Sequence, residues 1–372
     1  MWSQSGHAFR PQDGKTEVRF LPASQRIMKP QDYLRQLLIS SANRTLSSDE
    51  QALLDANGIE HFIFTKLTSK KFRKSKMEPE CVTRTQEAIK LRTQKNEPIT
   101  IVYPQGGYKL WRFPSSPTVD WAEFFNISFI LKYSAPIAKV YKPGVHIVYY
   151  MHTLLMELHD NLTTEEIQAY VSSFEDALNQ FRKHLPQNIS ISILRDADLY
   201  EREEYFTALE EGRGLAEIEY KSLLKAKTDD LARMANLNIK WNGKEDWTKL
   251  TRAQKDEKVY LAALYEMAAT SQLKRVFERV KSPDNVLIFA KATKDFIGIG
   301  STNASSAKYW VGFGVLQKKD DSFLPIVLTP NQYERSKKLE YITVSVDLIS
   351  APNFKEILVF EEPFSFSSQD QK

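Results

Sequence analysis

Short apolar segments recur along the first half of the chain, and each has the composition of a buried strand. Residues 98–103 are β-rich and bounded by prolines, residues 145–151 are strand-like, and residues 188–194 alternate between apolar and polar positions. A β-branched run or a period-two pattern is typical of strands, because successive side chains point to opposite faces of a sheet. The pattern therefore predicts three strands in this half.

The segments between these strands carry the signals of helices. Ser47 with Glu50 and Thr163 with Glu166 have the spacing of capping boxes, and Gly58 is expected to end the first of these helices. The predicted helices cover about 32–40, 47–58, 79–93, 120–133 and 163–184. Alternating strands and helices predict an α/β fold: a Rossmann-like, mostly parallel sheet with flanking helices.

The second half begins with a charged segment of helical pattern, at about 199–282, and ends in strands. The predicted strands lie at 286–291, 308–316, 341–348 and 356–360, where short connections favour antiparallel pairing. We expect a polar N-terminal arm at 1–30, a single α/β domain at 31–365 that contains the helical subregion, and a disordered tail at 366–372.

The composition limits the class of protein. The chain has 372 residues, a net charge of +4 and one cysteine, Cys81. A single cysteine excludes a disulfide framework within the chain and a cysteine-based zinc site. No apolar run approaches the roughly 18 residues of a membrane span, and the first residues lack the apolar stretch of a signal peptide. We therefore expect a cytoplasmic protein that does not span a membrane.

A glycine-containing loop follows the first strand of the predicted sheet. It carries Gly106, Gly107, Lys109 and Arg112. Ligands of parallel α/β sheets sit beyond the carboxyl ends of the strands, and paired glycines let backbone amides approach an anion. Because Lys109 is followed by leucine, the loop is not a Walker A motif. A substrate-binding loop and an ordinary glycine turn both fit this pattern.

Two carboxylates open the helix after this loop. Asp120 and Glu123 have capping-box spacing, which explains them as a structural pair. A helix N-terminus also favours ionised carboxylates, so the same pair could hold the amine of a substrate. The spacing is compatible with both interpretations, and capping is the commoner one.

Several polar residues follow the second strand, including His152, Glu157, His159 and Asp160. The usual His-x-x-x-His pairing of a zinc site is absent among them. We therefore expect no metal site, and no motif of the chain indicates a cofactor.

Residues 65–76 form a basic segment with six cations and no acid. A solvated surface loop, a nucleic-acid patch and a lid over a substrate phosphate all fit it. In the lid hypothesis, Lys70, Lys71 and Arg73 bind the phosphate. Aromatic residues that could stack on bases are almost absent from the segment, which favours the lid over nucleic acid.

A second loop rich in small hydroxylated residues spans 298–308. Ser301, Thr302 and Asn303 could wrap a phosphate or a sugar together with backbone amides, although flexible-loop composition explains them nearly as well. If both loops follow parallel strands, they should converge on one pocket.

The order of these segments resembles that of the PvcA/dityrosine-type isonitrile synthases. The stretches that carry the resemblance are the strand with its proline at 99–104, Lys109, Asp120 with Glu123, residues 137–144, and Asp160 before Thr163. The resemblance covers about residues 59–181.

This resemblance implies a Rossmann-like fold and a metal-free reaction in which the amine of an amino acid condenses with the carbonyl of ribulose 5-phosphate. It also implies that Lys109, Asp120, Glu123 and Asp160 belong to the substrate site. At 149–153 the chain reads Tyr-Tyr-Met-His-Thr where the family has a Ser-Asp-Gly turn. A relative acting on another amine or sugar phosphate is equally compatible with the sequence.

The leading hypothesis is a biosynthetic enzyme, a lyase or transferase that joins an amino-acid-like amine to a phosphorylated sugar. The alternatives are a nucleic-acid or nucleotide-binding protein that uses residues 65–76, and a non-catalytic relative that binds a metabolite.

Overall fold

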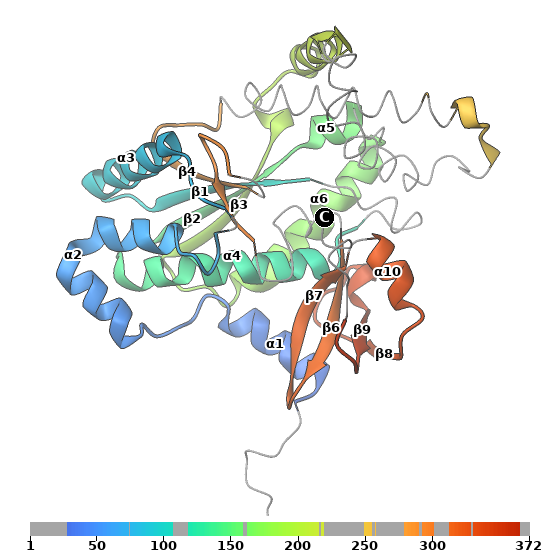
Figure 1. The fold of residues 1–372 in the computed structure, drawn as a ribbon, viewed down its shortest axis with the longest axis horizontal. Helices are drawn as coiled ribbons and strands as arrows, with labels where there is room; N and C mark the ends of the chain where they lie inside the picture. Colours follow the sequence, from blue (N-terminus) through green and yellow to red (C-terminus); the bar gives the residue numbers. More distant parts are fainter. Residues whose placement is uncertain are drawn as a thin grey trace, which may run out of the picture.

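A five-stranded parallel sheet forms the centre of the molecule in the computed structural model (Figure 1). The structure describes residues 28–73, 75–106, 118–158, 162–215, 217–218, 249–254, 257, 279–289, 292–300, 312–328 and 330–364. The strand order is β3-β2-β1-β4-β5, and every neighbouring pair is parallel. The strands are β1 (Ile99–Gln105), β2 (Val145–Met151), β3 (Ile189–Arg195), β4 (Asn285–Phe289) and β5 (Ile297–Gly298). The predicted Rossmann-like, mostly parallel sheet is confirmed.

Helices cover both faces of this sheet. They are α1 (Pro30–Ser40), α2 (Ser48–Leu67), α3 (Pro79–Lys95), α4 (Trp121–Val140), α5 (Thr153–Leu158), α6 (Thr164–Arg182) and a helix at 202–215. Alternate residues of β1 divide between two hydrophobic clusters, because successive side chains point to opposite faces. Ile101 joins the larger cluster with α4 and α6, and Val102 joins the smaller one with Tyr205 and Leu209 of helix 202–215.

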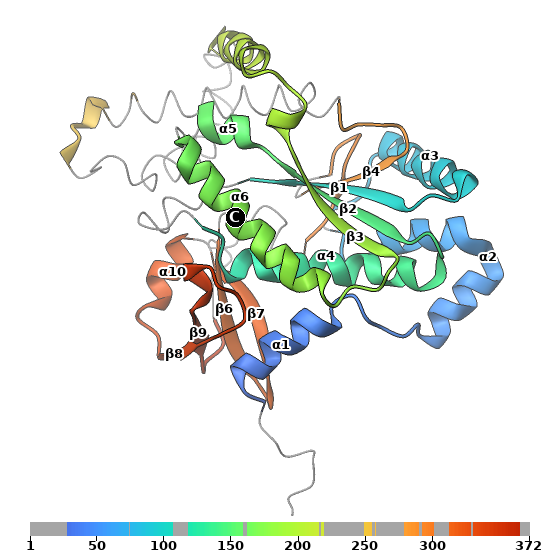
Figure 2. The same cartoon turned by 180° about the vertical axis from the view of Figure 1, so that it is seen from behind.

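Helix α4 runs along one face of the parallel sheet (Figures 1 and 2). Seventeen of its 20 residues are buried, an all-round burial that suits its largely apolar sequence. The helix was expected to end near Tyr133, but it continues to Val140 with Pro136 inside it. Tertiary burial of Ile137 and Ala138 outweighs the local cost of the proline.

A second, four-stranded sheet of order β7-β6-β9-β8 packs against the first turns of α4 (Figure 2). Its elements are β6 (Phe313–Lys319), β7 (Ser322–Leu328), α10 (Pro330–Ser336), β8 (Tyr341–Ser345), the short helix η4 (Pro352–Phe354) and β9 (Glu356–Phe360). Antiparallel pairing, expected for the C-terminal strands, holds for β6 with β7 and β8 with β9, whereas β6 and β9 are parallel. Leu316 and Val359 belong to the same hydrophobic cluster as α4, so the two sheets share one core.

Three differences from the sequence prediction have physical causes. Gly58 has a non-helical φ of 77°, yet α2 resumes after it and runs to Leu67, because Phe62 and Ile63 are buried in the core. Strand β7 was not predicted; it holds Pro325 in its middle, which an edge strand tolerates. The two-residue strand β5 is too short to leave a pattern.

Parts of the predicted domain organisation lie outside the described residues. These parts are residues 1–27 of the arm, most of the helical subregion at 199–282, and the tail at 366–372. Within that subregion, residues 202–215 are helical. None of the helices that the structure describes is both long enough and apolar enough to span a lipid bilayer.

The close approach of β6 to α4 gives a first testable prediction. A Cβ atom on Gly314 would lie 2.3 Å from the backbone nitrogen of Ala122 and 2.3 Å from the carbonyl carbon of Trp121. Both are main-chain atoms of a buried helix and cannot move aside. Gly314→Ala should therefore lower the free energy of unfolding by about 3 kcal/mol, measured by urea denaturation.

Gly214→Ala is the matched control. Gly214 lies in helix 202–215, where a Cβ would meet nothing within 4 Å. Alanine is the better helix former, so this change should raise stability by up to about 1 kcal/mol. Equal effects of the two substitutions would contradict the packing that we describe.

Candidate functional site

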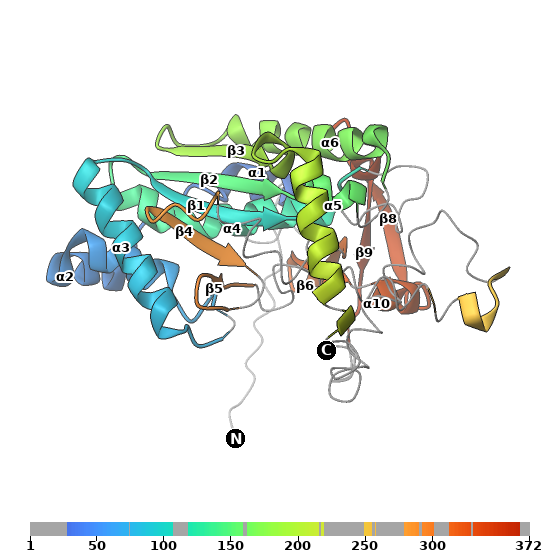
Figure 3. The same cartoon turned by 90° about the horizontal axis from the view of Figure 1, so that it is seen from above.

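The carboxyl ends of β1, β2 and β3 meet at one edge of the parallel sheet (Figure 3). The residues that follow these strands are Gly106, His152 and Asp196. β1 connects onward to β2 on one side, whereas β4 pairs on its other side, so the strand order reverses at β1. Open α/β sheets bind their ligands beyond the carboxyl ends of strands at such a reversal.

Asp120 and Glu123 form the predicted capping box at this edge. Asp120 Oδ1 accepts a hydrogen bond from Ala122 N at 3.0 Å, and Glu123 Oε2 accepts one from Asp120 N at 3.1 Å. The other carboxylate oxygen of Asp120 accepts from Gly314 N in β6 at 3.3 Å. Both oxygens of Asp120 are therefore engaged by main-chain amides, which fits a structural role for this carboxylate.

Glu123 also faces a second polar group. The hydroxyl of Tyr170, from α6, lies 3.2 Å from Glu123 Oε1 and 2.8 Å from the carbonyl oxygen of Gly106. Gln105, the last residue of β1, donates from Nε2 to the same hydroxyl at 3.1 Å. Glu123, Gln105 and Tyr170 are buried, so α4, β1 and α6 meet in a polar cluster inside an otherwise apolar core.

Asn126 extends this cluster by one helical turn. It lies three positions after Glu123 on the same face of α4, and its Nδ2 donates to the hydroxyl of Tyr103 at 2.9 Å. Tyr103 precedes Gln105 by two residues in β1, so both point to the same face of the sheet. The amide oxygens of Gln105 and Asn126 are fully buried and accept no hydrogen bond from the residues that the structure describes.

His152 follows β2 at the same edge, on the opposite face of the sheet. Its ring contacts that of Tyr150 with centroids 5.0 Å apart, and its backbone N–H donates to Gln105 O at 3.3 Å. Burial lowers the pKa of His152 to about 4, because the charged imidazolium would lose its hydration. The side chain is therefore neutral at physiological pH.

Asp196 begins the short helix η2 (Asp196–Asp198) after β3, and it is fully buried. Its Oδ1 accepts hydrogen bonds from Thr153 Oγ1 at 2.7 Å and from the backbone amides of Leu154 and Ala197, both at 2.9 Å. Desolvation outweighs these hydrogen bonds and raises the pKa of Asp196 to about 6. This residue links the ends of β2 and β3.

The basic segment lies beside the start of the second predicted loop. Gly300 N donates to Phe72 O at 2.9 Å, and Arg73 forms an isolated antiparallel bridge with Ile299 at the end of β5. Lys70 and Lys71 are exposed and Arg73 is partly buried. The two segments, far apart in the sequence, are therefore neighbours at the carboxyl end of β5.

Two features of the basic segment disfavour a nucleic-acid surface. The ring of Phe72 packs edge-on against Phe129 and Tyr133 of α4, with centroids 5.6 and 5.3 Å apart, so it cannot stack on a base. Lys66 lies within α2 and pairs with Glu50 at 2.9 Å. Part of the segment that could have been a solvated loop therefore belongs to helix α2, and Phe72 packs against the core.

The predicted site residues separate into three groups. Gly106, Asp120 and Glu123 come together at the carboxyl end of β1. Lys70, Lys71 and Arg73 lie in the segment that pairs with the end of β5. Gly107, Lys109, Arg112, Asp160, Ser301, Thr302 and Asn303 lie outside the described residues.

The sequence did not predict a role in the site for Gln105, Asn126 or Tyr170. Each belongs to a segment that reads as an ordinary strand or helix, and only the meeting of three elements makes them a cluster. The one signal available was polarity: Gln105 ends an apolar strand, and Asn126 interrupts the apolar run of α4.

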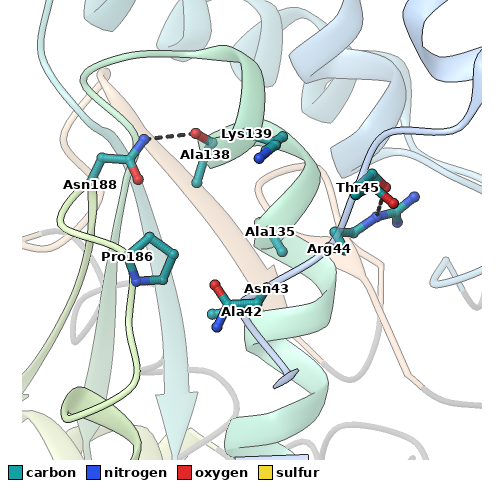
Figure 4. Close-up of a pocket in the computed structure, with 9 residues that line it drawn as sticks. All are labelled: Ala42, Asn43, Arg44, Thr45, Ala135, Ala138, Lys139, Pro186 and Asn188. Atoms are coloured by element: carbon teal, nitrogen blue, oxygen red, sulfur yellow. Dashed lines mark hydrogen bonds between the residues drawn. The ribbon is translucent and has the colours of Figure 1, made fainter. Parts of the chain in front are cut away.

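Cavities in the described part of the chain lie outside this cluster. One of about 270 Å³ is lined by Asp120, Gly314 and Tyr333, between α4 and the second sheet. Another, of about 800 Å³, lies among Ala42–Thr45, the last turns of α4, and Pro186 with Asn188 (Figure 4). This second cavity is at the amino-terminal edge of the parallel sheet, opposite the edge where ligands bind.

Metal chemistry was not expected from the sequence. Among the residues that the structure describes, no group of three or more His, Cys, Asp or Glu side chains is placed to hold a metal ion.

The chain is similar to known proteins in its structure and not in its sequence. No protein-family model matches the chain, and no curated protein matches it in sequence. The crystal structure of the PvcA protein from Pseudomonas aeruginosa is similar, with a TM-score of 0.56 and 15% sequence identity. The similarity covers 81% of this chain and 99% of that chain. The chain has a PvcA-like fold. This agrees with the resemblance inferred from residues 59–181, and at this identity the likeness is one of fold.

Within this PvcA-like fold, Asp196 and His152 give a prediction about pH. The pKa of Asp196 is raised to about 6, so the native state binds a proton that the unfolded chain releases near pH 4. Its stabilising contribution is present below pH 4 and is lost as the pH rises through 6. The pKa of His152 is lowered to about 4, so its contribution is present above pH 6.5 and is lost as the pH falls to 4.

The contributions of Asp196 and His152 to the free energy of unfolding change in opposite directions between pH 4 and 6. Asp196→Asn removes the first one, so the variant should be more strongly destabilised at pH 4 than at pH 7. A pKa displaced by about two pH units makes this difference roughly 3 kcal/mol. Urea denaturation across this range tests it, with Asp55→Asn, an exposed aspartate, as control. A pH-independent effect of Asp196→Asn would show that the Asp196 carboxyl is not protonated in the native state.

Proposed function

We propose that this protein is a small-molecule biosynthetic enzyme that binds an amino-acid-like amine at the carboxyl edge of the parallel sheet and condenses it with a phosphorylated sugar carbonyl. The PvcA-like fold and the order of segments in the sequence support this class of reaction. The observation that carries the proposal is the buried polar cluster at the end of β1.

The cluster offers acceptors that match an ammonium group. A primary ammonium has three N–H donors and no acceptor. Glu123 supplies a carboxylate, and the amide oxygens of Gln105 and Asn126 accept no hydrogen bond from the described residues. In number, the Glu123 carboxylate and these two amide oxygens match the three donors of an amine. A buried unsatisfied acceptor costs about 1–3 kcal/mol, so a bound amine would recover this free energy.

Asp120 acts as a positioning residue in this proposal. Its carboxylate holds the first turn of α4 and the amide of Gly314, while its own backbone N–H holds Glu123 Oε2. The side chain of Glu123 is thereby oriented toward the hydroxyl of Tyr170. Asp120 and Glu123 were expected to bind the amine together. In this proposal Glu123 binds the amine and Asp120 orients Glu123.

The phosphate of the second substrate is assigned to the cations and amides of the two loops. Gly106, Gly107, Lys109 and Arg112 belong to the first loop, and Ser301, Thr302 and Asn303 belong to the second. The pairing of Phe72 with Gly300 supports a contribution from Lys70, Lys71 and Arg73, because it brings their segment to the start of the second loop. We assign Asp160 to the same site as a further substrate ligand.

The chemical step needs no metal. Glu123 takes one proton from the bound ammonium, and the amine nitrogen then attacks the carbonyl carbon. The carbonyl oxygen receives the two protons that the nitrogen releases and leaves as water, which gives an imine. Lys109 polarises the carbonyl and relays one of these protons, giving its own to the oxygen and regaining one from the nitrogen.

Amine recognition is tested by binding. Isothermal titration calorimetry with the proteinogenic L-amino acids should identify a ligand whose 2-hydroxy analogue, without the amine, binds at least tenfold more weakly. Asn126→Leu and Gln105→Leu should each weaken the amino acid by about 10- to 100-fold, since a hydrogen bond to a charged group contributes about 1.5–3 kcal/mol. Glu123→Gln should weaken it at least as much.

Asn43→Ala is the matched control, because Asn43 is an exposed amide at the opposite edge of the sheet. It should leave affinity unchanged. Equal binding of the amino acid and its hydroxy analogue would contradict the amine site.

The role of Lys109 is tested by turnover. Lys109→Met should abolish product formation from the amino acid and ribulose 5-phosphate, followed by mass spectrometry, while amino-acid affinity stays within twofold of wild type. Undiminished product from this variant would contradict the role given to Lys109. Amino-acid binding without turnover by the wild-type chain would support the metabolite-binding alternative. Submicromolar, steeply salt-dependent RNA or DNA binding would support the nucleic-acid alternative.

A further inference from the structure

The second sheet has two edges, and they differ in how they are protected. Edge strands expose unpaired backbone groups and are normally blocked by proline, charge or a covering element. β7 has Pro325 in its middle, and α1 packs against it through Tyr33 and Phe323, whose ring centroids are 5.8 Å apart. The chain before α1 also pairs there, with Met28 N donating to Asp321 O at 3.3 Å.

β8 lies at the other edge of the sheet (Figures 1 and 3), and no helix or strand of the described residues pairs with its outer side. Its sequence, Tyr341-Ile-Thr-Val-Ser345, has no charge, no proline and no glycine. Tyr341 is 38% exposed and Ile342 is 51% exposed. Within the described part of the chain, β9 is the one strand that pairs with β8.

The hydrogen-bonding pattern shows which backbone groups point outward. Val346 N donates to Lys355 O at 2.8 Å, so residue 346 directs its polar groups toward β9. In an antiparallel pair this direction alternates along the strand. Tyr341, Thr343 and Ser345 therefore direct their N–H and C=O groups to the outer edge.

A second copy of the same strand complements this edge. In an antiparallel arrangement with Thr343 at the twofold axis, Tyr341 of each copy faces Ser345 of the other, so all the outward groups are paired. Ile342 of each copy then faces Val344 of the other, and Thr343 faces itself. Apolar β-branched pairs and Thr–Thr pairs both stabilise neighbouring strands. No charged residues face each other in this strand.

We propose that β8 is a self-association surface through which two copies of this chain join their second sheets into one continuous eight-stranded sheet. The partner is a second copy because the strand is complementary to itself under a twofold axis, as isologous dimers require. This inference rests on the second sheet alone and is independent of the proposed reaction.

The size of the surface indicates the strength of association. One pair of five-residue strands buries less than the roughly 1,600 Å² of a standard stable interface. We therefore expect a reversible dimer whose population rises with concentration in the micromolar range.

Two cysteine variants test the register. The chain has one native cysteine, Cys81, which is buried. Thr343→Cys places two thiols opposite each other at the axis, where the separation of Cα atoms in a hydrogen-bonded pair, about 5.5 Å, suits a disulfide. Ser345, like Thr343, is exposed, but Ser345→Cys places its thiols roughly 14 Å apart along the strands. Mild oxidation of the full chain should give a covalent dimer of the first variant and not of the second.

Sedimentation velocity across concentrations gives the second readout. The wild-type chain should shift from monomer toward dimer, and Thr343→Lys should stay monomeric because two lysines would face each other at the axis. Thr343→Val, which keeps a β-branched residue, should associate like wild type. The inference is overturned if the wild type stays monomeric throughout, if Thr343→Lys still dimerises, or if Ser345→Cys cross-links as readily as Thr343→Cys.

Discussion

The carboxylate of Asp120 is the interaction on which the rest of this structure depends. It caps the first turn of α4 and accepts a hydrogen bond from Gly314 in β6, so it fixes where the second sheet meets the helix that covers the first. The backbone of β6 can approach this closely because Gly314 has no side chain. Asp120 is buried, so loss of its carboxylate would leave these amides without their acceptor. These contacts fix the position of β6 against the start of α4.

The contact between α4 and β6 also determines the geometry of the candidate site. In the capping box that begins at Asp120, the backbone N–H of Asp120 holds Glu123 Oε2, so the orientation of Glu123 depends on the position of α4 relative to β6. From there Glu123 reaches Tyr170, and through it Gln105 and Gly106 at the end of β1. A polar cluster inside an apolar core lowers stability unless its groups find partners. Its presence at the carboxyl edge, where α/β proteins bind ligands, is the physical basis of the proposed amine site.

The sequence indicated part of this site. Asp120 and Glu123 were recognisable because capping boxes have a fixed spacing, and Gly106 because it follows a buried strand. The local pattern could not decide whether the two carboxylates act together or apart, since that depends on Gly314, distant in sequence. Gln105 and Asn126 carried no motif. Their amide oxygens matter because the packing of β1, α4 and α6 buries each of them without a hydrogen-bond partner among the described residues.

The sequence by itself determined the elements and the class of fold. Apolar periodicity and capping boxes are local properties, and they specified β1, β2, β3, the starts of α2, α4 and α6, and a parallel sheet. Tertiary structure alone decided the continuation of α2 past Gly58, the length of α4 beyond Tyr133, and the edge strand β7 with its proline. In each of these, burial against distant segments outweighs local propensity. The same reason applies to the site: its chemistry comes from contacts between elements, and no single stretch of sequence encodes a contact.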